Sequence, residues 1–214
     1  NVDAGAYHDV VDRMTHALVH RGPYVSGTFV SGPVGMGLQR LSSLDWTPAG
    51  HQPMTTPVSQ VRIVFNGEIY KYVELSNELK SLGHSFASTG DTEVLLRAYL
   101  EWGTDCLTRL NGMWAFVIYD RRRGTLFGSR DRFGIKPLYL YRNRDCALLA
   151  SEIKAIRASG LYRSKPNWAR AARFLVDGQI DETEETFYAG IEQISPGSAF
   201  EFGIDGSSRK CQYW

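Results

Sequence analysis

The sequence contains few cysteines, no long apolar run and almost no net charge. The cysteines are odd in number and far apart, so they fit neither a disulfide framework nor a metal cluster; they are Cys106, Cys146 and Cys211. No stretch approaches the ~20 apolar residues of a transmembrane helix, and no signal peptide opens the chain. With 24 basic and 23 acidic residues, neither nucleic acid nor an anionic membrane is expected as a partner. The cytoplasm is therefore the default localisation.

Repeats, low-complexity segments and a glycine-rich phosphate loop are also missing from these residues. A chain of 214 residues has ample material for a buried core, as one large domain or two small ones. It begins at Asn1 without a methionine and stops at Trp214 directly after a strand-like segment. We therefore expect it to be a piece of a longer protein.

Apolar residues at helical spacing predict several helices. Gly83 is expected to end one of them, Asp91 to cap the next at its N-terminus, and Ser151 to cap a short one. The predicted helices cover residues 7–20, 72–82, 93–102, 151–156 and 167–176.

Short runs of β-formers bounded by turn residues predict the strands, which are grouped rather than alternating with helices. Such an order favours an α+β fold over a parallel α/β sheet. The predicted strands cover residues 27–30, 34–39, 61–65, 113–119, 126–129, 137–141, 146–150, 187–188, 199–202 and 209–214.

The strand predicted at residues 61–65 is followed by Asn66-Gly67-Glu68, which we predict to form a turn. Gly67 would expose bare peptide N–H groups, and Asn66 would add a side-chain amide donor beside them. Two neutral donors of this kind are what a developing oxyanion needs in acyl transfer. The simpler alternative is a hairpin, because Asn-Gly between strands is a strong hairpin signal.

The longer string NGEIYKYVELSNELKSLGHSFASTGDTEVLL, at residues 66–96, resembles the glutaminase domain of asparagine synthetases. These are class II glutamine amidotransferases, in which the N-terminal residue is the nucleophile. Glucosamine-phosphate synthase and purine-pathway amidotransferases share the Arg-Gly and Asn-Gly elements but resemble the chain less well. Further family motifs occur in family order: HRGP at 20–23, RLS at 40–42, GHQP at 50–53, LNGM at 110–113, RDRFGIKPLY at 130–139, SEIK at 151–154 and YW at 213–214.

The resemblance covers nearly the whole chain and implies one glutamine amidotransferase type 2 domain at residues 1–214. It implies a four-layer αββα sandwich of two antiparallel sheets between helical layers. It also implies hydrolysis of L-glutamine to glutamate and ammonia through a cysteinyl thioester. The ammonia would pass to a C-terminal synthetase domain of the parent chain, where ATP and Mg serve to activate aspartate. No metal or cofactor is expected in the present domain, and a homodimer is left open.

By the same resemblance, the glutamine pocket contains an arginine for the α-carboxylate and acids for the α-ammonium. Arg40 takes the first role, and Asp91 and Glu68 take the second. Asn66 and Gly67 form the oxyanion hole. The segment after Arg40 forms the pocket wall and consists of Leu41, Ser42, Ser43 and Leu44. Taken singly, Arg40 is equally explained as a surface ion-pair partner and Asp91 as a helix cap.

Other charged residues in these motifs are expected to be structural. His20 closes a helix, where a cation interacts favourably with the helix dipole. Arg130, Asp131 and Lys136 surround a Gly-Ile turn and are expected to pair with one another. A role for them along an ammonia path stays open.

The sequence departs from the family at the nucleophile. The family reaction uses an N-terminal cysteine whose α-amine acts as the base, whereas this sequence starts at Asn1 and its three cysteines are internal. We expect that a Cys-Gly-Ile strand precedes Asn1 and that the chain is inactive without it. The alternative is a non-catalytic, glutaminase-like module, as in relatives that make β-lactams or cyclise lasso peptides.

A second departure is Tyr24, where the family usually has Asp. It affects a local loop rather than the pocket residues. A class II amidotransferase with another ammonia acceptor is the alternative enzyme.

Overall fold

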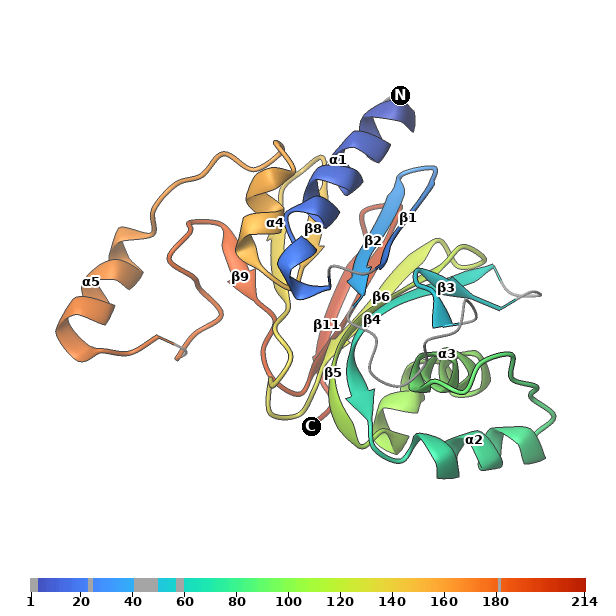
Figure 1. The fold of residues 1–214 in the computed structure, drawn as a ribbon. Helices are drawn as coiled ribbons and strands as arrows, with labels where there is room; N and C mark the ends of the chain where they lie inside the picture. Colours follow the sequence, from blue (N-terminus) through green and yellow to red (C-terminus); the bar gives the residue numbers. More distant parts are fainter. Residues whose placement is uncertain (1–3, 23–24, 41–49, 57–59, 181) are drawn as a thin grey trace.

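A computed structural model describes residues 4–22, 25–40, 50–56, 60–180 and 182–214 (Figure 1). Antiparallel strands form three sheets in this part of the chain. The largest has the order β11–β10–β6–β5–β4–β3. Its strands are β3 (Met54–Thr55), β4 (Val61–Ile69), β5 (Gly112–Asp120), β6 (Thr125–Arg130), β10 (Ser198–Gly203) and β11 (Ser208–Gln212).

Two smaller sheets lie against the first. One is the hairpin of β1 (Val25–Ser31) and β2 (Val34–Arg40). The other has the order β8–β7–β9 and consists of β7 (Tyr139–Arg142), β8 (Ala147–Ala150) and β9 (Ile191–Gln193). Among the described strands, β2 and β8 are therefore both edge strands, each paired on one side only.

Helices cover the outer faces. Helices α2 (Tyr72–Ser81) and α3 (Asp91–Trp102) pack on one face of the six-stranded sheet, and a 3₁₀ segment, Gly103–Arg109, follows α3. Helices α1 (Ala4–His16) and α4 (Ile153–Ala158) lie on the opposite side of the molecule, and α5 (Trp168–Asp177) projects from it (Figure 1). None of the described helices is long and apolar enough to cross a membrane.

Three groups of buried side chains join these layers. The core between α2, α3 and the six-stranded sheet contains Ile63, Leu79, Leu95, Trp114 and Phe116. Between the sheets, Val34 and Met36 of β2 pack near Tyr119, while Leu140 of β7 packs near Val117 and Phe200. Under α1 and α4, the buried residues include Leu148, Ala150, Ile156 and Ile191.

The predicted helices are confirmed in place, with changes at their ends. The first begins at Ala4 and stops at His16, and a 3₁₀ turn, Val19–Arg21, follows it. Gly83 does end α2 with a positive φ of 97°, but Leu82 is 51% exposed rather than part of the buried face. Ser151 is not a cap: Glu152 holds the N-cap position of α4, without a side-chain cap bond.

The predicted strands are largely confirmed, with one exception. Residues 187–188 form no strand; Tyr188 makes an isolated bridge to Pro166. The sequence reading also missed β3 and β9, which are only two and three residues long. Runs this short carry too little alternation to be recognised.

The prediction of a turn at Asn66-Gly67-Glu68 is wrong, and so is the hairpin alternative. Strand β4 continues to Ile69, with Asn66 opposite Ala115 and Gly67 opposite Trp114. Gly67 is needed for close approach, since a Cβ there would lie 2.2 Å from the Met113 carbonyl oxygen. An Asn-Gly pair therefore marks two backbones in close contact rather than a reversal.

The α+β class is confirmed. The strands form three antiparallel sheets rather than the two predicted.

Candidate active site

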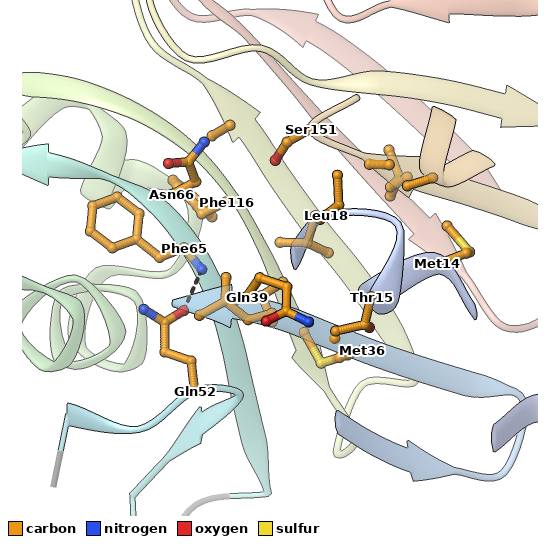
Figure 2. Close-up of a pocket in the computed structure, with 18 of the residues that line it drawn as sticks. Met14, Thr15, Leu18, Met36, Gln39, Gln52, Phe65, Asn66, Phe116 and Ser151 are labelled. Atoms are coloured by element: carbon orange, nitrogen blue, oxygen red, sulfur yellow. Dashed lines mark hydrogen bonds between the residues drawn. The ribbon is translucent and has the colours of Figure 1, made fainter. Parts of the chain in front are cut away.

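A cavity of about 710 Å³ lies between the six-stranded sheet, α1 and the edge strands β2 and β8. Much of its wall is apolar and includes Val11, Met36, Val117, Leu138 and Leu148. One end is polar and is formed by β4 and the start of α3, with Asn66, Gly67, Glu68, Asp91 and Thr92. Figure 2 shows Asn66 and Phe65 on one wall, and Met14 and Leu18 on the other.

Along β4, successive backbone N–H groups point alternately toward β5 and toward the outer edge of the strand, and this pattern places a donor at the polar end of the cavity. The Trp114 N–H, opposite Gly67, turns away from β4 and donates to the Asp131 carboxylate. Gly67 and Trp114 are therefore a pair without mutual hydrogen bonds, and the Gly67 N–H points to the outer edge of β4. On that edge, the N–H groups of Phe65 and Ile69 are bound by side chains of Gln52 and Asp91, 2.7 and 2.9 Å away. The Gly67 N–H lies between them, facing the cavity.

Asn66 contributes the second donor. Its Nδ2 is buried and finds no hydrogen-bond partner among the described residues. A buried amide nitrogen without a partner is costly unless a ligand satisfies it. The predicted pair of neutral donors is therefore brought together, on a strand instead of a turn.

Asp91 is the first residue of α3 rather than its cap, which corrects the sequence prediction; the N-cap is Gly90. The residue is only 6% exposed, and its Oδ2 accepts the Ile69 N–H at the end of β4, while backbone N–H groups at the start of α3 also hydrogen-bond the carboxylate. Burial, with a further contribution from the nearby Glu68 carboxylate, raises the pKa of Asp91. No described cation forms an ion pair with this carboxylate, and it lines the cavity. Such a group suits a positively charged ligand atom.

The predicted carboxylate-binding side falls mostly on residues outside the described part of the chain. The Arg40 backbone ends β2 and pairs with Val25, but its side chain lies outside the described residues. The predicted wall residues Leu41, Ser42, Ser43 and Leu44 also lie outside them, as does Tyr24. Their roles stay predictions.

The RDRFGIKPLY segment is confirmed as architectural, although its charged groups bind backbone rather than one another. Asp131 is fully buried and accepts the N–H groups of Trp114, Phe133, Ile135 and Lys136. Arg130 donates to the carbonyls of Lys136, Ile194 and Gly134. Satisfying this many buried backbone groups requires charged side chains with several donors or acceptors. Lys136 also lines the cavity.

His20 does not close the first helix as predicted, since α1 ends at His16; it lies in the Val19–Arg21 turn, at the cavity rim, and contacts an acid. Its Nε2 lies 2.9 Å from Glu152, which Arg21 and Lys154 also contact. Desolvation opposes ionisation of Glu152, but the hydrogen bonds from Arg21, His20 and Lys154 outweigh it and lower its pKa to about 2. The cluster joins the Val19–Arg21 turn to α4.

The cysteines do not assemble a nucleophilic site. Cys106 is buried in the core, and burial raises its pKa to about 12. Cys146 lines the cavity, but burial raises the pKa of its thiol as well. Cys211 is exposed on β11. A raised thiol pKa leaves little thiolate to attack a carbonyl.

Sequence reasoning gave no role to Gln52 or Thr92, although both line the polar end of the cavity. Gln52 lies in the GHQP motif, which was the available signal. No periodicity, however, predicts that its side chain reaches a backbone N–H 13 residues further along the chain.

This arrangement, an antiparallel α+β fold with two neutral donors and a buried carboxylate at one end of a cavity, accords with the family comparison. The chain belongs to the class II glutamine amidotransferases: the glutamine amidotransferase domain family matches residues 2–214.

The chain is similar in sequence to part of several longer proteins. The chain is 37% identical over 206 residues to asparagine synthetase [glutamine-hydrolyzing] 3 of Bacillus subtilis, covering 95% of this chain and 33% of that protein. It is 34% identical over 220 residues to amidase chry2 of Gibberella zeae, covering 100% of this chain and 31% of that protein. The chain thus spans about a third of the length of these relatives.

Among solved structures, glutamine phosphoribosylpyrophosphate amidotransferase from B. subtilis superposes with a TM-score of 0.70. The match covers 96% of this chain and 46% of that chain at 17% identity, so it supports the fold alone.

Proposed function

We propose that this domain binds L-glutamine and supplies ammonia to an asparagine synthetase. The observation that carries the proposal is the convergence of the Gly67 N–H, the unpartnered Asn66 amide and the buried Asp91 at one end of the cavity. In this arrangement Asp91, helped by Glu68, binds the α-ammonium group, and Arg40 with residues 41–44 binds the α-carboxylate. The side-chain amide of glutamine then reaches Asn66 and Gly67.

The chemistry that follows is amide hydrolysis. A thiol attacks the amide carbon, and the oxygen of the tetrahedral intermediate takes its charge beside the Asn66 Nδ2 and the Gly67 N–H. Collapse expels ammonia and leaves a thioester, which water hydrolyses to glutamate. The two donors are neutral and fixed on a strand, so they stabilise this charge with little reorganisation.

The nucleophile is proposed to enter on an extended segment that precedes the present chain. The unpaired edges of β2 and β8 both face the cavity, and the wall between them is apolar. A strand placed there would satisfy both edges and fill the apolar part of the cavity. It would also join β1–β2 and β8–β7–β9 into one sheet, which gives the predicted two-sheet, four-layer sandwich.

The ammonia acceptor is proposed to be aspartate, activated with ATP and Mg in a synthetase domain fused to this one. Asparagine synthetases at 37% and 36% identity support this choice. An ammonia acceptor other than aspartate is the second candidate. The similarity to a fungal amidase, which covers 100% of the chain at 34% identity, favours it. The full-length protein decides between them: with glutamine, ATP, Mg and aspartate it should form asparagine.

The amidotransferase function is tested by extending the chain so that the mature protein begins with Cys-Gly-Ile. This protein should release ammonia from glutamine, whereas the 214-residue chain should not. An extended protein that folds and binds glutamine but stays inert would instead identify a non-catalytic module.

The binding assignment is tested by calorimetry on the extended protein with its N-terminal cysteine replaced by alanine. Arg40→Ala should weaken glutamine binding by about 1.5–3 kcal/mol, the usual contribution of a charge-assisted hydrogen bond. Arg163→Ala is the control, because Arg163 is exposed. Equal affinities of the two variants would remove Arg40 from the pocket.

A further inference from the structure

Gln52 links the two elements that carry the polar end of the cavity. Its Oε1 accepts the Phe65 N–H of β4 at 2.7 Å, and its Nε2 donates to the Thr92 hydroxyl of α3 at 3.3 Å. Phe65 precedes Asn66, and Thr92 follows Asp91. A single side chain therefore joins the strand that carries the oxyanion donors to the helix that carries the ammonium-binding acid. Figure 2 shows its contact with Phe65.

The side chain takes the place of a missing strand partner. In the antiparallel register of β3 with β4, Met54 lies opposite Ile63, so continuation would bring Gln52 opposite Phe65 and Gly50 opposite Gly67. Strand β3 starts only at Met54, and the preceding Pro53 has no N–H for a ladder. The Gln52 amide accepts the Phe65 N–H that a backbone carbonyl would otherwise take.

The late start of β3 leaves the Gly67 N–H without a strand partner among the described residues. A continued β3 would cover the next outward N–H of β4, which is that of Gly67. On the outer edge of β4, the Gln52 side chain accepts the Phe65 N–H and the Asp91 carboxylate accepts the Ile69 N–H. The Gly67 N–H between them stays open to the cavity. Backbone contact also holds Gln52, because a Cβ on Gly27 would lie 2.0 Å from its carbonyl oxygen.

We propose that Gln52 is a positioning residue for the donors Asn66 and Gly67, acting through the Phe65 N–H and the Thr92 hydroxyl. The inference rests on the proposed function for its catalytic meaning. Gln52 touches neither the glutamine amide nor the nucleophile in this scheme. It fixes where the two donors stand relative to Asp91, and errors of about 1 Å in such placement can lower turnover about a hundredfold.

The test uses the extended protein that begins with Cys-Gly-Ile, with active sites counted by a thiol-directed glutamine analogue. Gln52→Leu should lower kcat per counted site by about 10- to 100-fold, with KM changed much less. Gln52→Glu keeps an acceptor for the Phe65 N–H and should restore most of the lost turnover. Gln60→Leu, at an exposed glutamine just before β4, is the matched control. Unchanged kcat per counted site in Gln52→Leu would overturn the proposal.

Thr92→Val provides a milder variant in case Gln52→Leu does not fold. It removes only the hydroxyl contact and should lower kcat roughly two- to tenfold, in keeping with one neutral hydrogen bond. Wild-type turnover in folded Thr92→Val would contradict the link to α3.

A readout without catalysis separates this inference from the proposed function. In the 214-residue chain, Gln52→Leu should speed hydrogen exchange at the Phe65 amide and shift the NMR signal of the Gly67 amide, whereas Gln60→Leu should do neither. If the extended wild-type protein releases no ammonia, the proposed function fails while this measurement still decides the role of Gln52 on β4. Identical Phe65 and Gly67 signals in Gln52→Leu and wild type would overturn it.

Discussion

Asn66 and Asp91 each hold a buried polar group whose hydrogen-bonding or charge requirement the described residues do not fully meet. Asn66 has a buried Nδ2 without a described partner, and Asp91 is a buried acid without a described cation. Each arrangement destabilises the folded protein, and under the proposed function bound glutamine would relieve each of them with a carbonyl oxygen and an ammonium group. The two residues therefore give different tests of the same site.

Asn66 is expected to act on turnover. In the extended protein, Asn66→Ala should lower kcat about 10²- to 10³-fold, the usual effect of removing one oxyanion donor. KM should change less, because the charge on the oxygen develops only in the transition state. Steady-state ammonia release measures both quantities. Asn77→Ala, on the exposed face of α2, is the control, and equal kcat values for the two variants would contradict the assignment.

Ionised Asp91 is expected to lower the stability of the folded protein at neutral pH while strengthening the binding of glutamine. The pKa of Asp91 is raised in the folded state, so the folded protein holds this proton more tightly than the unfolded chain does. The resulting stabilisation of the folded state is present at low pH and is lost as pH rises through the folded pKa. Asp91→Asn should therefore unfold at neutral pH at the same temperature as wild type or higher, since Asn can still accept the Ile69 N–H. It should also weaken glutamine binding by about 1.5–3 kcal/mol.

The pH dependence of binding gives an independent check on Asp91. Wild-type affinity for glutamine should fall on acidification at a pH above the ordinary Asp value of 3.8. Calorimetry across this range should find no such step in Asp91→Asn. A clear loss of thermal stability in Asp91→Asn, with glutamine affinity intact, would reverse both expectations.

At the scale of elements, the site depends on how closely β4 lies to β5 and how the 3₁₀ turn after α1 is tied to α4. Gly67 packs against the Met113 carbonyl of β5, which leaves no room for a side chain. On the other side of the molecule, Glu152 gathers His20, Arg21 and Lys154. Both contacts fix backbone segments rather than touching the ligand.

Gly67→Ala should separate β4 from β5. The new Cβ would lie 2.2 Å from a backbone oxygen and 2.8 Å from the Trp114 Cα, neither of which can move freely. We expect a loss of about 1–3 kcal/mol in unfolding free energy, as for other overpacked cores. Urea denaturation of the 214-residue chain measures this loss. If Gly67→Ala unfolded with the same free energy as wild type, the close contact between β4 and β5 would not require a glycine.

Glu152 should make the protein acid-sensitive. Its pKa falls from 4.5 to about 2 in the folded state, so its stabilising contribution is present above pH 4.5 and is lost as pH falls toward about 2. Glu152→Gln should lower the unfolding temperature at pH 6 and flatten its decline between about pH 4.5 and 2. Glu74→Gln, at an exposed residue of α2, is the control. Parallel curves for Glu152→Gln and wild type would contradict the role of the cluster.

At the scale of the whole molecule, one cavity reaches from the edges of β2 and β8 to the polar end of β4. An extended segment bearing the nucleophile would fill the first part and leave the second for glutamine. The same segment would complete the sheet, so folding and activity are expected to be coupled. The extended protein should therefore unfold at a higher temperature than the 214-residue chain.

The sequence by itself determined the α+β class, the main helices and the residue types of the site. Apolar periodicity is local, so it placed α2, α3 and β5 to within a few residues. The motif resemblance named Asn66, Gly67, Glu68 and Asp91, all of which line one cavity.

Only the tertiary structure decided where those residues lie and what they contact. Asn66-Gly67 lies within a strand because β5 packs against it, and Asp91 binds Ile69 because α3 begins beside the end of β4. Gln52 contacts a backbone N–H 13 residues away, and the cavity lies beside two strands that have no partner on one side among the described residues. Each of these depends on segments distant in sequence meeting in space, and local propensity contains no information about such meetings.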